Sequence, residues 1–196
     1  MSRFIVIEGL DGSGKTTISK RLVEYLRERG YRAHYTYEPS DSPFAEAFRR
    51  IKDLIETNSV IDALAMALDR AYHLSQEIEP LLREGYVVVS DRYYYSTIAY
   101  QGAMGLDIDW LVSLNKYFRR PDLAIYLDVS IETSLRRISG KKSAWPEYEK
   151  RDILSRAREI YLSLVERGEL VRIDAERGLE EVFRDVVSLT DHLLKT

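Results

Sequence analysis

Short apolar runs and stretches of helical periodicity alternate along the chain. Residues 4–8, 86–91 and 123–128 are nearly continuous runs of apolar, β-favouring residues, which is typical of strands buried on both faces of a parallel sheet. Residues 32–37 and 170–174 form two weaker strand patterns. In the stretches between these runs, apolar residues recur every three or four positions. The pattern therefore predicts a parallel sheet whose strands are joined by helical, right-handed crossovers.

The longest helical pattern covers residues 60–83 and carries two stripes. One stripe is mostly polar and consists of Met66, Arg70, His73 and Glu77. We expect His73 and Glu77 to lie on a solvated surface, whereas Arg70 is a candidate for ligand binding. The other stripe is apolar, and we expect it to face the core. Its members are Ile61, Leu64, Leu68, Ala71, Leu74, Ile78 and Leu82.

A glycine-rich segment links the first predicted strand to the first predicted helix. Its residues fit the spacing G-x-x-x-x-G-K-[ST], a P-loop whose backbone N–H groups surround the phosphates of a nucleoside triphosphate. Lys15 can reach the outer phosphates, and the hydroxyl of Thr16 can bind Mg²⁺. The following helix directs its positive end at the same anion. The residues expected to bind the triphosphate are Gly9, Leu10, Asp11, Gly12, Ser13, Gly14, Lys15, Thr16 and Thr17.

Composition narrows the class of protein without changing this picture. With 45% hydrophobic and 31% charged residues, a chain of 196 residues suits one globular domain, which we place at residues 1–196. The formal net charge of −3 argues against a nucleic-acid partner, because such a partner requires a basic face. The sequence has no cysteine and no apolar run as long as a membrane span. Because the first strand pattern starts at residue 4, we expect no signal peptide. We therefore expect a cytoplasmic protein with no membrane partner.

Residues 140–146 differ from their surroundings because they show no periodicity and carry two lysines. Arg136 and Arg137 come directly before them. A cationic lid that closes over a bound nucleotide would show this pattern, and so would a solvated basic loop. We place the expected lid at about residues 136–147.

Charged residues outside the P-loop indicate phosphoryl transfer rather than binding alone. Asp91 and Arg92 end the clearest strand, where open α/β sheets bind their ligands. The transition state of phosphoryl transfer spreads negative charge over three oxygens, so Lys15, Arg92 and the lid cations suit a kinase with two anionic substrates. A phosphate acceptor would need no general base, whereas a hydroxyl acceptor would, and Asp91 is the evident candidate.

With these motifs the chain resembles the thymidylate kinase family over almost its whole length. Many proteins share the P-loop, but the acidic residue inside it and four further motifs are narrower: Glu-Pro-Ser at 38–40, Ala-Leu-Asp-Arg at 67–70, Asp-Arg-Tyr at 91–93, and Ser-Thr-Ile-Ala-Tyr-Gln-Gly at 96–102. The resemblance implies an α/β, three-layer P-loop kinase fold, with a five-stranded parallel sheet flanked by helices and a short lid. It implies transfer of the γ-phosphoryl group of ATP to dTMP, giving dTDP and ADP for dTTP synthesis. It also implies Mg²⁺ as cofactor and a homodimer that buries the long helices.

The resemblance further implies roles for particular residues. Asp11 would accept a hydrogen bond from the 3′-hydroxyl of dTMP, and Tyr100 would crowd the sugar 2′ position and so favour deoxyribose. Asp91, with Thr16, would lie near the Mg²⁺. Within the acceptor site, Thr97 and Gln101 would read the polar edge of thymine. The residues expected to bind dTMP are Asp11, Pro39, Met66, Arg70, Arg92, Thr97, Tyr100 and Gln101.

Two positions depart from the family pattern. Met66 stands where the family commonly has a phenylalanine stacked on thymine. The P-loop holds no basic residue before its lysine, so the lid should supply a catalytic cation, yet the centre of the lid has lysines where arginine is more typical. The expected catalytic residues are Lys15, Arg92 and Arg137, together with Lys141 or Lys142.

Two other functions remain open on the sequence alone. A kinase of the same fold could phosphorylate another (deoxy)nucleoside monophosphate or a deoxynucleoside. Met66 leaves this alternative open, because it replaces the phenylalanine that the family commonly stacks on thymine. A nucleotide-binding regulator without catalysis is the second alternative. It is disfavoured because Lys15, Thr16, Asp91 and Arg92 are all present.

Overall fold

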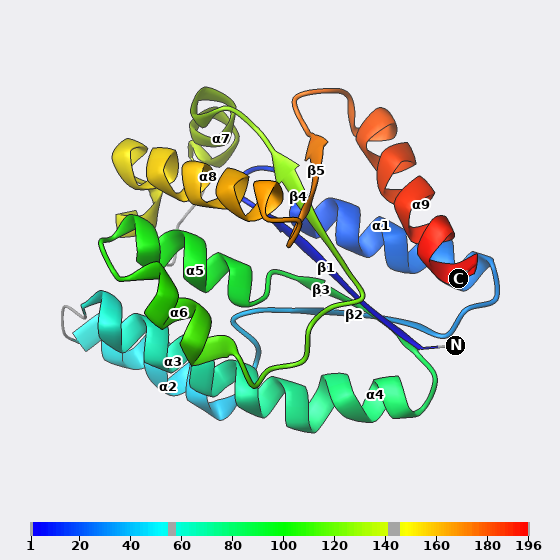
Figure 1. Ribbon diagram of the computed structural model, residues 1–196, viewed down its shortest axis with the longest axis horizontal. Helices are drawn as coiled ribbons and strands as arrows, with labels where there is room; N and C mark the ends of the chain where they lie inside the picture. The colour runs from blue at the N-terminus through cyan, green and yellow to red at the C-terminus, as the bar shows by residue number, and fades with distance from the viewer. Residues whose placement is uncertain (1, 55–57, 141–145, 196) are drawn as a thin grey trace.

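A five-stranded parallel sheet forms the centre of the computed structural model, which describes residues 2–54, 58–140 and 146–195 (Figure 1). The strand order is β2-β3-β1-β4-β5, and each neighbouring pair runs parallel. The five strands are β1 (Arg3–Gly9), β2 (Ala33–Tyr37), β3 (Val87–Asp91), β4 (Leu123–Asp128) and β5 (Val171–Asp174). The parallel sheet predicted from the apolar runs is confirmed.

The central strand β1 shows why the runs have apolar residues at consecutive positions. Phe4 and Val6 point into one hydrophobic core, while Ile5 and Ile7 point into the core on the opposite face. All four side chains are completely buried. A strand covered on both faces gains burial from every residue, so alternation with polar residues is lost.

Helices cover both faces of the sheet and complete three layers (Figure 1). Helices α1 and α9 lie on one face, whereas α5, α8 and the α3–α4 segment lie on the other. The helices are α1 (Lys15–Glu28), α2 (Pro43–Leu54), α3 (Ser59–His73), the π-helical turn η1 (Leu74–Ile78), α4 (Glu79–Arg83), α5 (Tyr94–Ala103), α6 (Ile108–Asn115), α7 (Ile131–Ile138), the 3₁₀ turn η2 (Pro146–Glu149), α8 (Arg151–Glu166) and α9 (Leu179–Lys195). Within the described ranges, no helix is long and apolar enough to cross a membrane.

The apolar stripe of the long helical segment divides into two halves. Its second half, from η1 onwards, is buried as expected, as Leu74 and Ile78 illustrate. In α3, by contrast, Leu64 is 49% exposed and Leu68 is 50% exposed. The expectation that the whole stripe faces the core is therefore wrong for α3, because this helix turns its polar side inward.

The polar side of α3 is correspondingly buried. His73, expected on a solvated surface, is only 2% exposed, so that expectation is wrong. Its position follows from a carboxylate on the neighbouring chain segment, Glu38, which lies 3.3 Å from the ring. Glu77 is half-buried and also contacts His73. Buried charges of this kind require partners, and the fold supplies them.

The register of the sheet brings the chemically important segments together. Asp91, the last residue of β3, lies level with Ile7 of β1 and with Tyr37 of β2. The segments that leave these three strands therefore start at the same edge of the sheet. Glu38, Arg92 and the P-loop meet there, at the carboxyl ends where parallel sheets bind ligands.

Candidate active site

The P-loop leaves β1 and enters α1 in a conformation that glycine makes possible. Gly12 has a φ of 79° and Gly14 a φ of 99°, in the left-handed region that other residues rarely adopt. A Cβ atom on Gly12 would also lie 2.9 Å from the carbonyl oxygen of Ser134. Gly14 precedes α1 without any side-chain cap, so the amides at the start of the helix face the pocket.

Lys15 begins α1 and is buried in this loop. Its ammonium donates a hydrogen bond to the carbonyl oxygen of Leu10 at 2.8 Å. Burial, reinforced by the positive charge of Arg92, lowers the pKa of Lys15 to about 8. The anionic phosphates of a nucleotide would act in the opposite direction and keep the ammonium charged.

Thr16 and Asp91 face each other across the same loop. The Thr16 hydroxyl donates to Oδ2 of Asp91 at 2.5 Å. The other oxygen, Oδ1, is buried and has no hydrogen-bond partner among the described residues. A hydroxyl and an unsatisfied carboxylate oxygen are hard oxygen ligands, which suit Mg²⁺ bound mainly through phosphates. No group of three or more His, Asp or Glu side chains in the described part of the chain could hold a metal by itself.

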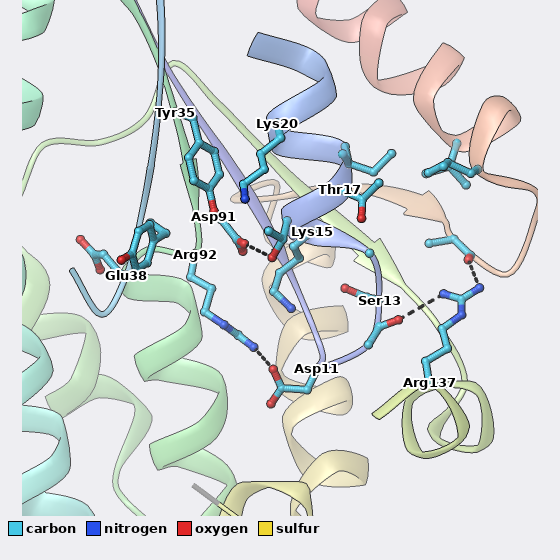
Figure 2. Close-up of a pocket in the computed structure, with 18 of the residues that line it drawn as sticks. Asp11, Ser13, Lys15, Thr17, Lys20, Tyr35, Glu38, Asp91, Arg92 and Arg137 are labelled. Carbon is cyan, nitrogen blue, oxygen red and sulfur yellow. Dashed lines mark hydrogen bonds and ion pairs between the residues drawn. The ribbon is translucent and has the colours of Figure 1, made fainter. Parts of the chain in front are cut away.

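Arg92 occupies a backbone conformation that is unusual for any residue except glycine. Its φ is 75°, which costs on the order of 1–3 kcal/mol and persists only where surrounding contacts impose it. Those contacts are an ion pair with Oδ1 of Asp11 at 2.5 Å and a 2.9 Å hydrogen bond to the hydroxyl of Ser96. The left-handed turn directs the guanidinium back towards the P-loop (Figure 2).

Asp11 is held in the P-loop by two groups. Besides Arg92, it contacts Tyr100, whose hydroxyl lies 3.4 Å from Oδ2 and accepts a 3.2 Å hydrogen bond from the Asp11 backbone N–H. Burial opposes ionisation of Asp11, but the charges of Arg92 and Lys15 outweigh it and hold the pKa of Asp11 below its usual value. The carboxylate is therefore a charged, immobilised group rather than a free base.

Two cavities meet at these residues. The larger, with a volume of about 810 Å³, runs from the P-loop to Arg137, Ala175 and Arg177. The smaller has a volume of about 110 Å³ and lies between α3, α5 and η2. The two cavities share three lining residues, namely Asp11, Glu38 and Arg92.

The smaller cavity contains the remaining residues predicted to bind an acceptor. Its lining includes Pro39, Met66, Arg70, Thr97, Tyr100 and Gln101, brought together from three separate parts of the sequence. The structure thus assembles in one cavity the residues that the resemblance implied for dTMP. The roles expected for them stay predictions, and their contacts within the protein are described next.

Arg70 is anchored by three different side chains. Its Nε donates to Oε2 of Glu38 at 2.8 Å, one terminal nitrogen donates to Oδ1 of Asn115 at 2.7 Å, and the other lies 3.1 Å from the hydroxyl of Thr97. Thr97, expected to read thymine, contacts Arg70 through its hydroxyl. A guanidinium whose orientation is fixed by hydrogen bonds is a preorganised site for an anion.

Tyr148 closes one end of the smaller cavity, beside Tyr100 and Gln101. The side-chain amide of Gln101 donates to the Tyr148 hydroxyl at 3.1 Å, and the ring of Tyr148 lies 5.7 Å from that of Tyr100. The Tyr148 hydroxyl also donates a short hydrogen bond to Asp62 of α3. Met66 and Pro39 line the same cavity.

Arg137 lies on the other side of the P-loop from Arg92 (Figure 2). Its guanidinium donates to the carbonyl oxygens of Gly12 at 3.3 Å and Ala175 at 3.4 Å. It therefore lines the far wall of the larger cavity rather than the junction of the two cavities. Lys141 and Lys142, the other expected lid cations, lie outside the described residues.

Sequence reasoning missed Glu38, Asn115 and Tyr148 as site residues. Glu38 belongs to the Glu-Pro-Ser motif, which could have marked it as a site residue. Its pairing with Arg70 could not be predicted, because the two residues are 32 positions apart in the sequence. Nothing in the helical patterns singled out Asn115 or Tyr148. Their contacts arise only when α6 and η2 pack beside α5.

A P-loop cavity joined to a second, arginine-lined cavity defines a nucleotide-dependent phosphotransferase. Comparison with known families agrees, since the family model described as thymidylate kinase matches residues 7–186. This chain belongs to the thymidylate kinase family.

Similar proteins cover nearly the whole chain. A probable thymidylate kinase of Staphylothermus marinus is 46% identical over 192 residues, covering 97% of this chain and 96% of the relative. One from Pyrococcus horikoshii is 45% identical over 202 residues, covering 97% of each. One from Caldivirga maquilingensis is 36% identical over 201 residues, covering 100% of this chain and 96% of the relative.

Proposed function

We propose that this protein transfers the γ-phosphoryl group of ATP to dTMP, giving ADP and dTDP. The observation that carries the proposal is the junction of two cavities at Asp11, Glu38 and Arg92. A donor bound in the larger cavity and an acceptor in the smaller one would meet at the guanidinium of Arg92. The thymidylate kinase relatives, which match nearly the full chain, support dTMP as the acceptor.

On the donor side, the P-loop amides and Lys15 would hold the β- and γ-phosphates of ATP. The open N-terminus of α1 favours the same negative charge. Arg137, on the far wall, would contact the nucleoside end of ATP rather than the transferred group. Arg92 would stabilise the charge that develops on the transferred oxygens, because it is already aimed at the junction before reaction.

Mg²⁺ fits the oxygens that this chain offers. Thr16 and Asp91 would hold it, and the unpartnered Oδ1 of Asp91 is the observation that supports this assignment. When bound, the ion would neutralise phosphate charge and align the phosphates for in-line transfer.

On the acceptor side, the chemistry favours a phosphate nucleophile over a hydroxyl. A phosphate oxygen of dTMP is already anionic, so positioning and electrostatic stabilisation suffice. A hydroxyl acceptor would need a base, yet Asp11 is paired with Arg92 and Asp91 is hydrogen-bonded to Thr16. Arg70 would hold the acceptor phosphate, and Met66 would pack against the base.

Steady-state kinetics with a panel of acceptors tests the proposal. We expect the highest kcat/KM with dTMP, a lower value with dUMP, and little turnover of dCMP, dGMP or thymidine. If another acceptor is phosphorylated faster than dTMP, that acceptor is the substrate and the proposal for dTMP is wrong. Absence of dTMP-dependent ADP formation with Mg²⁺ at any temperature would instead favour a regulator that binds nucleotides without catalysis.

A homodimer is the assembly that best accounts for the exposed side of α3. Ile61, Leu64 and Leu68 are between 41% and 50% exposed, and Leu54 of α2 is 82% exposed beside them. The ring of Phe44 on α2 contacts Tyr72 on α3, with centroids 5.5 Å apart, so the apolar patch is continuous across both helices. A second copy of the same patch would remove it from water.

The single domain and the cytoplasmic location expected from the sequence remain predictions.

A further inference from the structure

A row of buried polar side chains runs from Arg70 towards the protein surface, behind the smaller cavity. Its central member is His73, the last residue of α3, whose side chain is 1% exposed. The π-helical turn η1 begins at the next residue and contains Glu77. Such turns are rare and frequently occur at functional sites.

Both ring nitrogens of His73 face hydrogen-bonding groups. Nδ1 lies 3.3 Å from Oε1 of Glu38, while Nε2 lies 2.7 Å from the hydroxyl of Thr36 and 3.5 Å from Oε2 of Glu77. Carboxylates thus flank the ring on both sides. Only the imidazolium form, with a proton on each nitrogen, can donate to both carboxylates at once.

The charges around the ring favour that form. Burial alone would lower the pKa of His73, but Glu38 and Glu77 outweigh it and raise the pKa to about 9. Hydrogen bonds from His34 and His73 hold the pKa of Glu77 well below its usual range, so this carboxylate stays ionised at neutral pH. Arg70, on the same helix, binds the opposite oxygen of Glu38.

Glu38 connects His73 to the acceptor cavity. Its Oε1 faces His73, and its Oε2 accepts from Nε of Arg70 at 2.8 Å. A carboxylate fixed by a cation at each oxygen cannot rotate without breaking one of the two ion pairs. With a neutral residue at position 73, Glu38 could turn, and Arg70 would lose its fixed orientation.

We infer that His73 is a positioning residue: in its protonated form it fixes Glu38, and Glu38 in turn holds Arg70 ready for the acceptor phosphate. His73 does not touch the acceptor, because Glu38 and Arg70 stand between them. The inference rests on the proposed function, since it assigns the smaller cavity to a nucleoside monophosphate. The half-exposed pair of His34 and Glu77, with Nε2 and Oε1 2.8 Å apart, closes the row at the surface.

Replacing the ring by an uncharged hydrogen-bonding side chain tests the inference. For His73→Gln, we expect KM for dTMP to rise about tenfold while kcat changes less than about threefold, because binding of the acceptor phosphate is weakened most. KM for ATP should stay within about twofold, which also shows that the variant is folded. The matched control is His192→Gln, at an exposed histidine on α9, for which neither KM should change.

A pH profile separates positioning from mere structural support. The dissociation constant of dTMP is measured by calorimetry from pH 7 to 10 for the wild type and His73→Gln. Comparing both proteins at each pH cancels the ionisation of dTMP itself. The ratio of the two constants should be about ten at pH 7 and should approach one above pH 9, where wild-type His73 loses its proton. A ratio that does not change with pH would overturn the inference.

A double-mutant cycle tests the path through Glu38. In a Glu38→Gln background, His73→Gln should weaken dTMP binding by less than about twofold, because the two changes break the same connection. A full tenfold loss in that background would overturn the path. If both single variants fold poorly, ring ¹⁵N chemical shifts of wild-type His73 decide, since a neutral ring at pH 7.5 would contradict the inference. Lack of wild-type activity on dTMP would instead refute the proposed function, so the two failures are distinguishable.

Discussion

The two faces of α3 reverse the usual relation between polarity and burial. On one face, Leu64 and Leu68 are about half exposed. On the other face, Asp69, Arg70 and His73 are each 2% exposed. A helix in a globular protein normally turns its apolar stripe inward. In α3 the inward face is the one that lines and supports the acceptor cavity.

The polar face can be buried because each of its charges meets a partner. Asp69 accepts hydrogen bonds from the backbone N–H and hydroxyl of Ser40 and from the hydroxyl of Ser42, at 2.5 to 2.8 Å. Arg70 and His73 share Glu38. An unpaired charge at such positions would be costly, whereas a paired and hydrogen-bonded one is tolerated. Burial on this face therefore reflects specific partners from distant segments of the chain.

The apolar face has no such partner within the described residues of its own chain. Its exposure extends onto α2, which lies beside α3 at the edge of the molecule (Figure 1). The contrast teaches that the two faces of one helix differ in purpose: the polar face builds the site, and we propose that the apolar face packs against a second copy. The substitutions below test each face separately.

The largest expected effect comes from removing the guanidinium on the polar face. Arg70→Ala should lower kcat/KM for dTMP by about a thousandfold, corresponding to about 4 kcal/mol, because the variant loses a charged contact to the acceptor and leaves Glu38 partly unpaired. KM for ATP should stay close to that of the wild type. Steady-state kinetics measures both. The matched control is Arg50→Ala on α2, where the arginine is exposed and pairs with Glu46 in a surface bridge. A similar loss in the control would remove the distinction between the faces.

The next effect concerns the apolar face. Leu68→Glu should weaken self-association by about 3 kcal/mol, because it would place two like charges in a dry interface. Sedimentation velocity should then report a species of 22.8 kDa at concentrations where the wild type has twice that mass. Val171→Glu supplies the control, since Val171 is similarly exposed, at 41%, but lies on the edge strand β5. A monomeric wild type would show that the exposed face serves another purpose.

The sequence predicted the sheet and the P-loop because their signals are local. Runs such as residues 123–127 are apolar at consecutive positions because the strand is buried on both faces, and the P-loop needs its glycines at fixed spacing. Because strands and helices alternate along the chain, only a few sheet topologies are possible. These features could be predicted without knowledge of any long-range contact.

The orientation of α3 could not be predicted in the same way. Periodicity shows that Leu64 and Leu68 share a face, but it does not show whether that face meets the core or another molecule. The buried positions of Arg70 and His73 depend on Glu38, more than 30 residues away in the sequence. Only the folded chain reveals such a pairing. The resemblance to a family located Arg70 at the site, but it gave no reason for the burial of His73.

A moderate effect on stability is expected at Asp69, where the polar face of α3 contacts the loop after β2. Asp69→Asn should lower the free energy of unfolding by about 2 kcal/mol, because the amide replaces an acceptor oxygen with a donor that faces the Ser40 backbone or the two hydroxyls. Chemical denaturation gives the value. The exposed Asp109→Asn on α6 is the control and should change stability by less than about 0.5 kcal/mol. Equal stabilities for the two variants would contradict the view that buried partners hold this face in place.

The smallest effect is expected at Met66, which stands on α3 where the cavity begins. Its thioether lines the base end of the cavity and is intermediate in burial. Met66→Phe would offer a flat ring for stacking on thymine in place of a flexible chain, so dTMP affinity should rise about twofold to fivefold, or by about 0.5–1 kcal/mol. Discrimination against dCMP and dGMP should sharpen by a similar factor, since a rigid ring adapts less well to other bases. Leu64→Phe, two residues away and on the apolar face of α3, is the matched control and should leave acceptor affinity unchanged. If Met66→Phe weakened dTMP binding, the cavity would lack the space for a ring, and this chain would recognise its base by packing that is specific to methionine.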